Sequence, residues 1–181
     1  MKINARTLNT IHISFGGIVS VLAFYFLGKE MLIGWIFQSF AGALYTLYFW
    51  RQKLPIMATV MLGAETILPV YGLYKWSTSI NLFTTIDGII LGLTTLFVLY
   101  IGYKMFQDRT NKFLFTLIEF SNALLYIIAA LILSITQSVL AWWLFIFVFA
   151  LTLILVFVRK EWIAVGFQIA YIALGILAIF N

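Results

Sequence analysis

Two carboxylic acids, Glu65 and Glu119, lie within long apolar stretches of the chain. Insertion scales put the cost of a charge at the centre of a bilayer at about 3 kcal/mol, so an acid at that depth faces other helices or a polar cavity. Neither acid is accompanied by the Ser, Cys or His arrangements that are typical of nucleophilic catalysis. The two acids therefore indicate a binding site inside a helical bundle, and we do not expect an enzyme.

Other polar and aromatic side chains recur at helical spacing. Positions three, four and seven apart share one side of a helix, and Asn122 and Tyr126 share a side with Glu119 in this way. Gln, Asn, Glu and Tyr side chains that converge from several helices favour a lined cavity, although they could instead be hydrogen bonds that hold helices together. The candidate substrate-binding residues are Trp35, Gln38, Glu65, Glu119, Asn122, Tyr126, Trp143, Gln168 and Tyr171.

Three other residues have simpler interpretations. Pro69 has no backbone N–H, so we expect it to bend its helix and to free the carbonyl group of Glu65. Trp76, at the end of the same segment, is expected to be an interfacial anchor. Asp87 lies close to the end of the next segment, where we expect its carboxylate to reach the lipid headgroups.

The composition explains why the solvent must be lipid. Hydrophobic residues make up 64% of the 181 residues and charged residues only 9%, with a mean hydropathy of +1.10. A soluble domain has about 25% charged residues and could not bury this much apolar surface. The net charge of +5 comes from basic residues scattered between apolar segments, which does not favour nucleic-acid binding. With no Cys and one His, no disulfide, metal or other cofactor is predicted.

Seven apolar segments are long enough to be transmembrane helices. A helix needs about 20 apolar residues to cross the bilayer, and only helices and closed barrels satisfy their backbone there. Period-two alternation is missing, so we predict an all-α, multi-pass membrane protein of the cell inner membrane. The predicted spans are Ile11–Gly28, Met31–Trp50, Leu54–Tyr74, Asn81–Phe106, Phe113–Ser134, Ser138–Val158 and Trp162–Phe180.

The loop charges predict the orientation of these spans. Nine of the eleven basic residues fall on one side of the predicted membrane, and only Lys29 and Lys75 fall on the other. The positive-inside rule then places the N-terminus in the cytoplasm and the C-terminus outside.

A shift of 108 residues superimposes the first three spans on the last three. Residues 11–76 and 113–180 are then two three-helix repeats within a single membrane domain, and residues 81–106 form a linking helix. At this shift Trp35 corresponds to Trp143 and Arg51 to Arg159. Because the linking helix is single, the two repeats run in the same direction, so we predict a 3+1+3 parallel repeat.

The run from Gly34 to Trp76 resembles the PnuC family of bacterial vitamin transporters. Gly34 and Trp35 open the second span as in that family, the loop at 51–53 is basic, and the third span ends in Tyr-Gly-x-Tyr-x-Trp at 71–76. The second half departs from the family pattern, because its Trp and Asn cluster is reduced to Trp142 and Trp143.

The resemblance implies a facilitator of vitamin uptake by alternating access, most often for nicotinamide riboside and in some branches for thiamine or riboflavin. A cytoplasmic vitamin kinase would trap the product, and the protein itself would use no ATP. A flat cationic ring of this kind suits aromatic faces near a carboxylate. The expected partners are therefore the vitamin, the lipid bilayer and, functionally, the kinase, and a homo-oligomer is compatible with the sequence.

Three alternatives remain open at this point. The first is thiamine transport by the same mechanism. The second is the substrate-binding subunit of an energy-coupling-factor importer, which would have six spans and ATPase partners. The third is a non-transporting membrane assembly protein, whose polar residues would face outward rather than inward.

Overall fold

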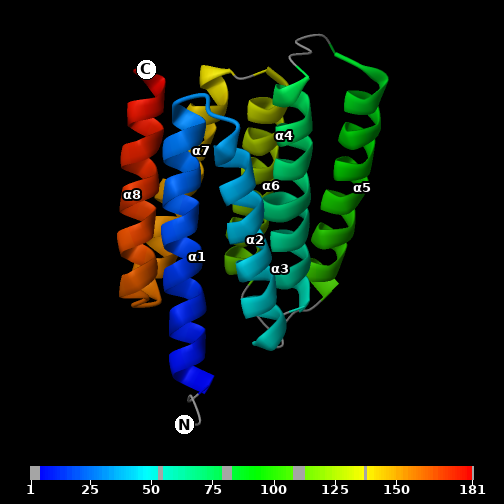
Figure 1. The fold of residues 1–181 in the computed structure, drawn as a ribbon. Helices are drawn as coiled ribbons and strands as arrows, with labels where there is room; N and C mark the ends of the chain where they lie inside the picture. Colours follow the sequence, from blue (N-terminus) through cyan, green and yellow to red (C-terminus); the bar gives the residue numbers. More distant parts are fainter. Residues whose placement is uncertain (1–4, 53–54, 79–82, 108–112, 137, 181) are drawn as a thin grey trace.

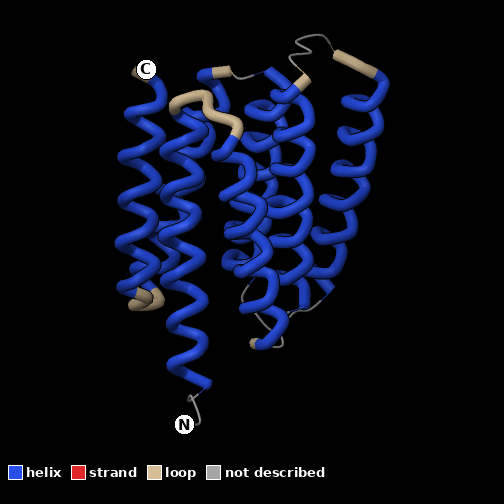
Figure 2. The backbone as a smooth tube through the Cα atoms, viewed as in Figure 1, coloured by secondary structure: helices blue, strands red, loops and turns tan. Residues whose placement is uncertain are grey.

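The chain forms a bundle of long helices that run side by side in the computed structural model (Figures 1 and 2). The structure describes residues 5–52, 55–78, 83–107, 113–136 and 138–180, and within these ranges there is no strand. The helices are α1 (Ala5–Gly28), α2 (Ile33–Arg51), α3 (Pro55–Val60), the π-helix η1 (Met61–Ile67), α4 (Leu68–Ser77), α5 (Thr85–Gln107), α6 (Phe113–Thr136), α7 (Val139–Val158) and α8 (Trp162–Ile179).

Each of the seven predicted spans corresponds to one helical rod, because α3, η1 and α4 follow one another as a single third rod. The prediction of an all-α fold is therefore confirmed. Among the described residues, four helices are long and apolar enough to cross a membrane: Thr10–Gly28 of α1, and α5, α7 and α8. A membrane location is compatible with these helices.

Six of the rods close into a ring. In order around the ring, α1 packs on α2, α2 on the third rod, the third rod on α6, α6 on α7, α7 on α8, and α8 again on α1. The remaining helix, α5, lies outside the ring against α6 and α3 (Figure 1). The first and last triplets thus meet at α1 with α8 and at α4 with α6. This arrangement fits the 3+1+3 repeat, which stays a prediction.

The third rod changes its winding in the middle. The N–H of Leu68 donates to the carbonyl of Gly63, five residues earlier, so η1 is wound more loosely than an α-helix. The sequence predicted a bend at Pro69, and the structure places a π-helix in the turns directly before it. A methyl group on Gly42 of α2 would lie 2.1 Å from the carbonyl oxygen of Glu65, so the glycine allows α2 to approach this part of the rod closely.

Aromatic rings fill the ring of helices towards its upper end, which is where α8 ends in Figure 1. Phe24 makes edge-on contacts with Trp142 and Phe145, with ring centroids 6.1 and 5.3 Å apart. The rings of Trp35 and Trp76 cross at 87° with centroids 5.2 Å apart, and the indole N–H of Trp76 donates to the carbonyl of Leu133. The prediction that Trp76 is an interfacial anchor is therefore wrong, because this side chain is part of the core.

Candidate binding cavity

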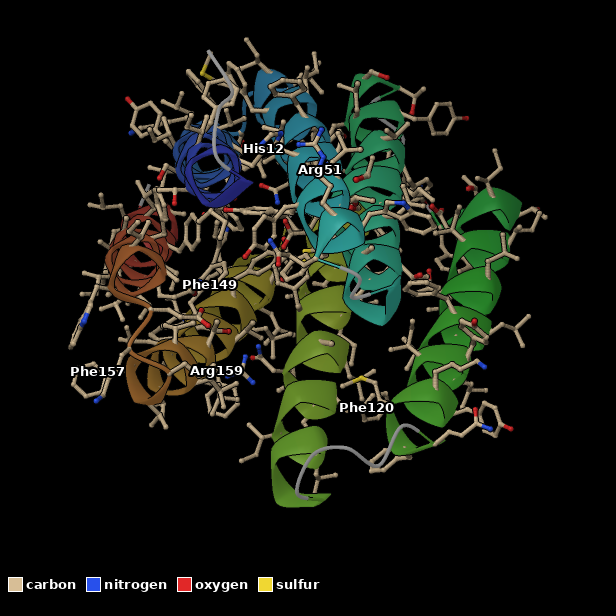
Figure 3. The ribbon with its side chains drawn as sticks, turned by 90° about the horizontal axis from the view of Figure 1, so that it is seen from below. His12, Arg51, Phe120, Phe149, Phe157 and Arg159 are labelled. Carbon is tan, nitrogen blue, oxygen red and sulfur yellow. The ribbon has the colours of Figure 1, made fainter. Side chains whose placement is uncertain are left out.

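A cavity of about 1050 Å³ lies inside the ring. All six ring rods contribute to its wall, and it extends to the connection between α7 and α8, where Arg159, Lys160 and Trp162 line it. That connection lies at the lower end of the bundle, where α1 begins. Figure 3, viewed from this end, labels His12 on α1, Arg51 at the end of α2 and Arg159 after α7. A volume of this size is enough for a small organic solute, since ligand pockets commonly enclose about 300–1,000 Å³.

Glu65 is linked to three other rods by a chain of hydrogen bonds. The hydroxyl of Tyr126 in α6 is hydrogen-bonded to the Glu65 carboxyl group, and it accepts a bond of 3.2 Å from the amide nitrogen of Gln38 in α2. The amide oxygen of Gln38 in turn accepts from the hydroxyl of Ser20 in α1, at 3.4 Å. The position of the carboxyl group is therefore fixed by side chains from α1, α2 and α6.

Three tyrosines from three helices lie near the same carboxyl group. Tyr45 of α2, Tyr126 of α6 and Tyr171 of α8 all lie close enough to Glu65 to interact with it electrostatically, and all line the cavity. Tyr171 also hydrogen-bonds with Tyr45 and donates to the carbonyl of Gly17 at 3.4 Å. The result is an aromatic wall with one acid in it, which suits a flat or cationic ligand.

Three buried oxygen atoms in this wall have no hydrogen-bond partner: Oε2 of Glu65, Oδ1 of Asn122 and Oε1 of Gln168. They come from the third rod, α6 and α8. A buried acceptor without a partner costs about 1–3 kcal/mol, so each oxygen calls for a hydrogen-bond donor. The empty cavity is therefore short of donors, and a ligand that brings several of them would satisfy it.

The orientation of the Asn122 amide follows from its neighbour. The hydroxyl of Thr152 in α7 donates to the carbonyl of Val148 at 2.9 Å, so it must accept from the amide nitrogen of Asn122, which lies 2.8 Å away. The amide nitrogen is thus held by α7, and the amide oxygen is the atom left for a ligand.

Five of the nine predicted site residues line the cavity, namely Glu65, Asn122, Tyr126, Gln168 and Tyr171. A sixth, Gln38, is buried directly behind Tyr126. The backbone of Glu119 belongs to α6, but its side chain lies outside the described residues.

The two predicted tryptophans do not reach the cavity wall. Trp35 is 2% exposed and packs against Trp76 in the upper core, so it is buried but away from the lining. Trp143 is 57% exposed on the outside of the ring, whereas Trp142 points inward. One helical residue step turns a side chain by about 100°, which is enough to exchange these two positions. Trp35 and Trp143 are therefore removed from the expected ligand contacts.

Several lining residues were not predicted from the sequence. Tyr45 lies seven residues after Gln38 and so shares its helix face, a spacing that could have identified it. Thr152 carries the only hydroxyl group in α7 and could have been found as the polar exception in an apolar helix. Phe24, Phe149 and Phe167 carry no such signal, because phenylalanine is frequent throughout the chain.

A smaller depression of about 360 Å³ lies at the upper end, lined by residues that include Lys29, Trp76 and Trp142. Trp142 of this depression touches Phe24, which lines the main cavity, so the two spaces approach each other at this ring contact. The main cavity thus reaches the lower end, and this aromatic contact lies between it and the upper depression.

A second buried acid lies outside the ring, between α4 and α5. Asp87 has 0% of its surface exposed, and its carboxylate lies 2.7 Å from the ammonium group of Lys75. It also accepts hydrogen bonds from the hydroxyl groups of Tyr71 and Thr84. The expectation that Asp87 reaches the headgroups is therefore wrong, because this carboxylate joins α5 to the third rod.

The fold and the cavity together define a helical bundle of membrane-protein type with a polar, aromatic-lined interior. No protein-family model, no curated protein and no solved structure matches the chain. Within the described residues, no group of three or more His, Cys, Asp and Glu side chains could hold a metal ion.

Proposed function

We propose that this protein is a membrane facilitator that carries a small vitamin or vitamin precursor, with nicotinamide riboside as the first candidate, by alternating access. The observation that carries the proposal is the set of three unpartnered acceptor oxygens, on Glu65, Asn122 and Gln168, in one aromatic-lined cavity. The resemblance of the third span to the PnuC family supports the same assignment.

The chemistry of nicotinamide riboside matches what the cavity lacks. The molecule brings a carboxamide N–H₂ group, ribose hydroxyl groups and a flat pyridinium ring with a positive charge. The carboxamide and hydroxyl groups are donors for the Asn122 and Gln168 oxygens, and the ring suits the tyrosine faces and the Glu65 carboxyl group. Each of these ligand features therefore has a candidate counterpart in the cavity wall.

The cavity shape supports transport rather than storage. The cavity reaches the lower end of the bundle, and its mouth is lined by Arg159 and Lys160. By the positive-inside rule this basic end is cytoplasmic, and the structure then corresponds to an inward-facing state. In the outward-facing state the contact between Phe24 and Trp142 would open and the upper depression would become the entrance. A cytoplasmic kinase would keep the transported vitamin from returning.

Thiamine is the second candidate, since it also combines a cationic ring with amine and hydroxyl donors. The seven helical rods differ from the six spans expected of an energy-coupling-factor subunit. The inward direction of the Gln38, Asn122 and Gln168 side chains also differs from the outward polar surface expected of an assembly protein.

Uptake of labelled nicotinamide riboside into vesicles that contain a kinase tests the proposal, with labelled thiamine in a parallel series. We expect Asn122→Ala to weaken apparent affinity about tenfold, because one buried hydrogen bond to the ligand is lost. Trp143→Ala is the matched control and should leave uptake unchanged, since this side chain faces outward. Vesicles that accumulate neither compound would refute the proposal.

A further inference from the structure

Glu65 is an acid in the wall of the cavity, and one of its oxygen atoms is buried without a hydrogen-bond partner. Among the described residues the structure records no ion pair for it, and its Oε2 atom accepts no hydrogen bond. A carboxylate that is buried without a counter-charge is strongly disfavoured, and it binds a proton or a cation instead. The geometry of the site therefore requires a positive partner at this group.

The groups that face Glu65 from the neighbouring helices cannot supply that partner. α2 contributes the phenol of Tyr45, α6 that of Tyr126, and α8 that of Tyr171, while α4 directs Tyr71 and Lys75 to Asp87. The basic residues that line the cavity, Arg159 and Lys160, come from the connection at its lower mouth.

The surroundings of the carboxyl group also suit an organic cation. Tyrosine side chains from three helices lie near the carboxyl group, and aromatic rings attract positive charge, as in the aromatic cages that bind quaternary ammonium groups. A proton and an organic cation would therefore compete for the same oxygen atoms.

We propose that Glu65 binds either one proton or one organic cation, so that entry of the cation releases one proton. This inference rests on the proposed function and adds a coupling step to it. The reaction is balanced: the protonated, empty site and the cation give the occupied site and one free proton, and no bond other than the O–H bond breaks. A carrier that returns empty then carries the proton in the opposite direction, so transport becomes an exchange of one cation for one proton.

This exchange has a consequence for the direction of transport. Where the outside is more acidic than the cytoplasm, protons bound from outside oppose entry of the cation at Glu65. Net uptake must then be sustained by removal of the vitamin inside, and uptake should slow as the outside pH falls.

Calorimetric titration of the purified protein with nicotinamide riboside, in buffers of different ionisation enthalpy, measures the number of protons released. We expect close to one proton per cation bound. The reduced, uncharged dihydro form of nicotinamide riboside is the matched probe, and it should bind with no proton released. Glu65→Gln should release no proton with the cation, and it should fold like the parent, because the amide can keep its bond to Tyr126.

The outcomes separate the two proposals. Binding of the cation with no proton released, or the same proton release in Glu65→Gln as in the parent, would overturn the exchange and leave the facilitator intact. If nicotinamide riboside and thiamine both fail to bind to the parent protein, the proposed function itself is wrong. An unfolding midpoint equal to that of the parent shows that Glu65→Gln is folded.

Discussion

The protein buries two acids in opposite ways. The Asp87 carboxylate has an ammonium group at 2.7 Å and hydrogen bonds from Tyr71 and Thr84, so its charge is compensated. The Glu65 carboxyl group is held on one side by Tyr126 and has an oxygen atom with no partner on the other. The first arrangement joins two helices, whereas the second leaves an oxygen atom of Glu65 without a hydrogen-bond partner. In this bundle, the acid whose charge and hydrogen bonds are satisfied, Asp87, is therefore structural. Glu65, which has an unsatisfied oxygen atom, is a candidate functional residue.

Removal of the charge of Asp87 should have the largest effect on stability. Asp87→Asn leaves the Lys75 ammonium group buried beside a neutral amide, and breaking a buried pair in this way costs about 3–5 kcal/mol. We expect a lower unfolding midpoint in detergent, measured by denaturant titration.

The double variant Lys75→Met with Asp87→Asn is the control for this prediction. It removes both charges, so it should recover most of the lost stability. A loss as large as that of the single variant would show that the ion pair does not account for the effect.

Gly42→Ala should have an intermediate effect. The added methyl group would lie 2.1 Å from the carbonyl oxygen of Glu65, so α2 or η1 must shift, at a cost of about 1–3 kcal/mol. The same substitution at Gly92 of α5 meets no atom within 4 Å and should instead stabilise by up to about 1 kcal/mol, because alanine favours the helix. Equal unfolding midpoints for the two variants would contradict the close approach of α2 to Glu65.

Glu65→Gln should have the smallest effect on stability, within about 0.5 kcal/mol of the parent, since a neutral amide replaces an acid that is already neutral in the ligand-free protein. Its effect should appear in ligand binding. If Glu65→Gln destabilised the protein as strongly as Asp87→Asn, the two acids would both be structural and the contrast between them would disappear. Denaturant titrations of both amide variants under the same conditions measure this.

The rods of the fold could be predicted from the sequence because apolar segments of bilayer length are separated by charged residues. Glu65 was identified as a candidate functional residue because an acid is rare in such a segment. The role of Asp87 was missed, since its partner Lys75 lies on the preceding rod and only the packing of α5 against the third rod brings the two together. The position of Asp87 close to the end of its segment predicts an exposed side chain, whereas the contact with the third rod buries it.

The cavity-lining face of α7 was the least predictable part of the site. The helix is almost uniformly apolar, so its sequence gives no period from which an inner side can be chosen. The correspondence with Trp35 predicts that Trp143 faces inward, whereas the structure shows that the inward residue is its neighbour Trp142. By contrast, Asn122 and Tyr126 occupy a polar face of α6 that can be identified from spacing alone, and both line the cavity.

The loose winding of η1 sets the phase between the two halves of the third rod. Glu65 faces the cavity from η1, and Tyr71 and Lys75 face Asp87 from α4. A π-helical turn absorbs one extra residue, so the same residues wound as a regular α-helix would turn one half by about 100° relative to the other. The winding of η1, independently of which residues it contains, therefore determines whether the two acids can reach their separate partners at once.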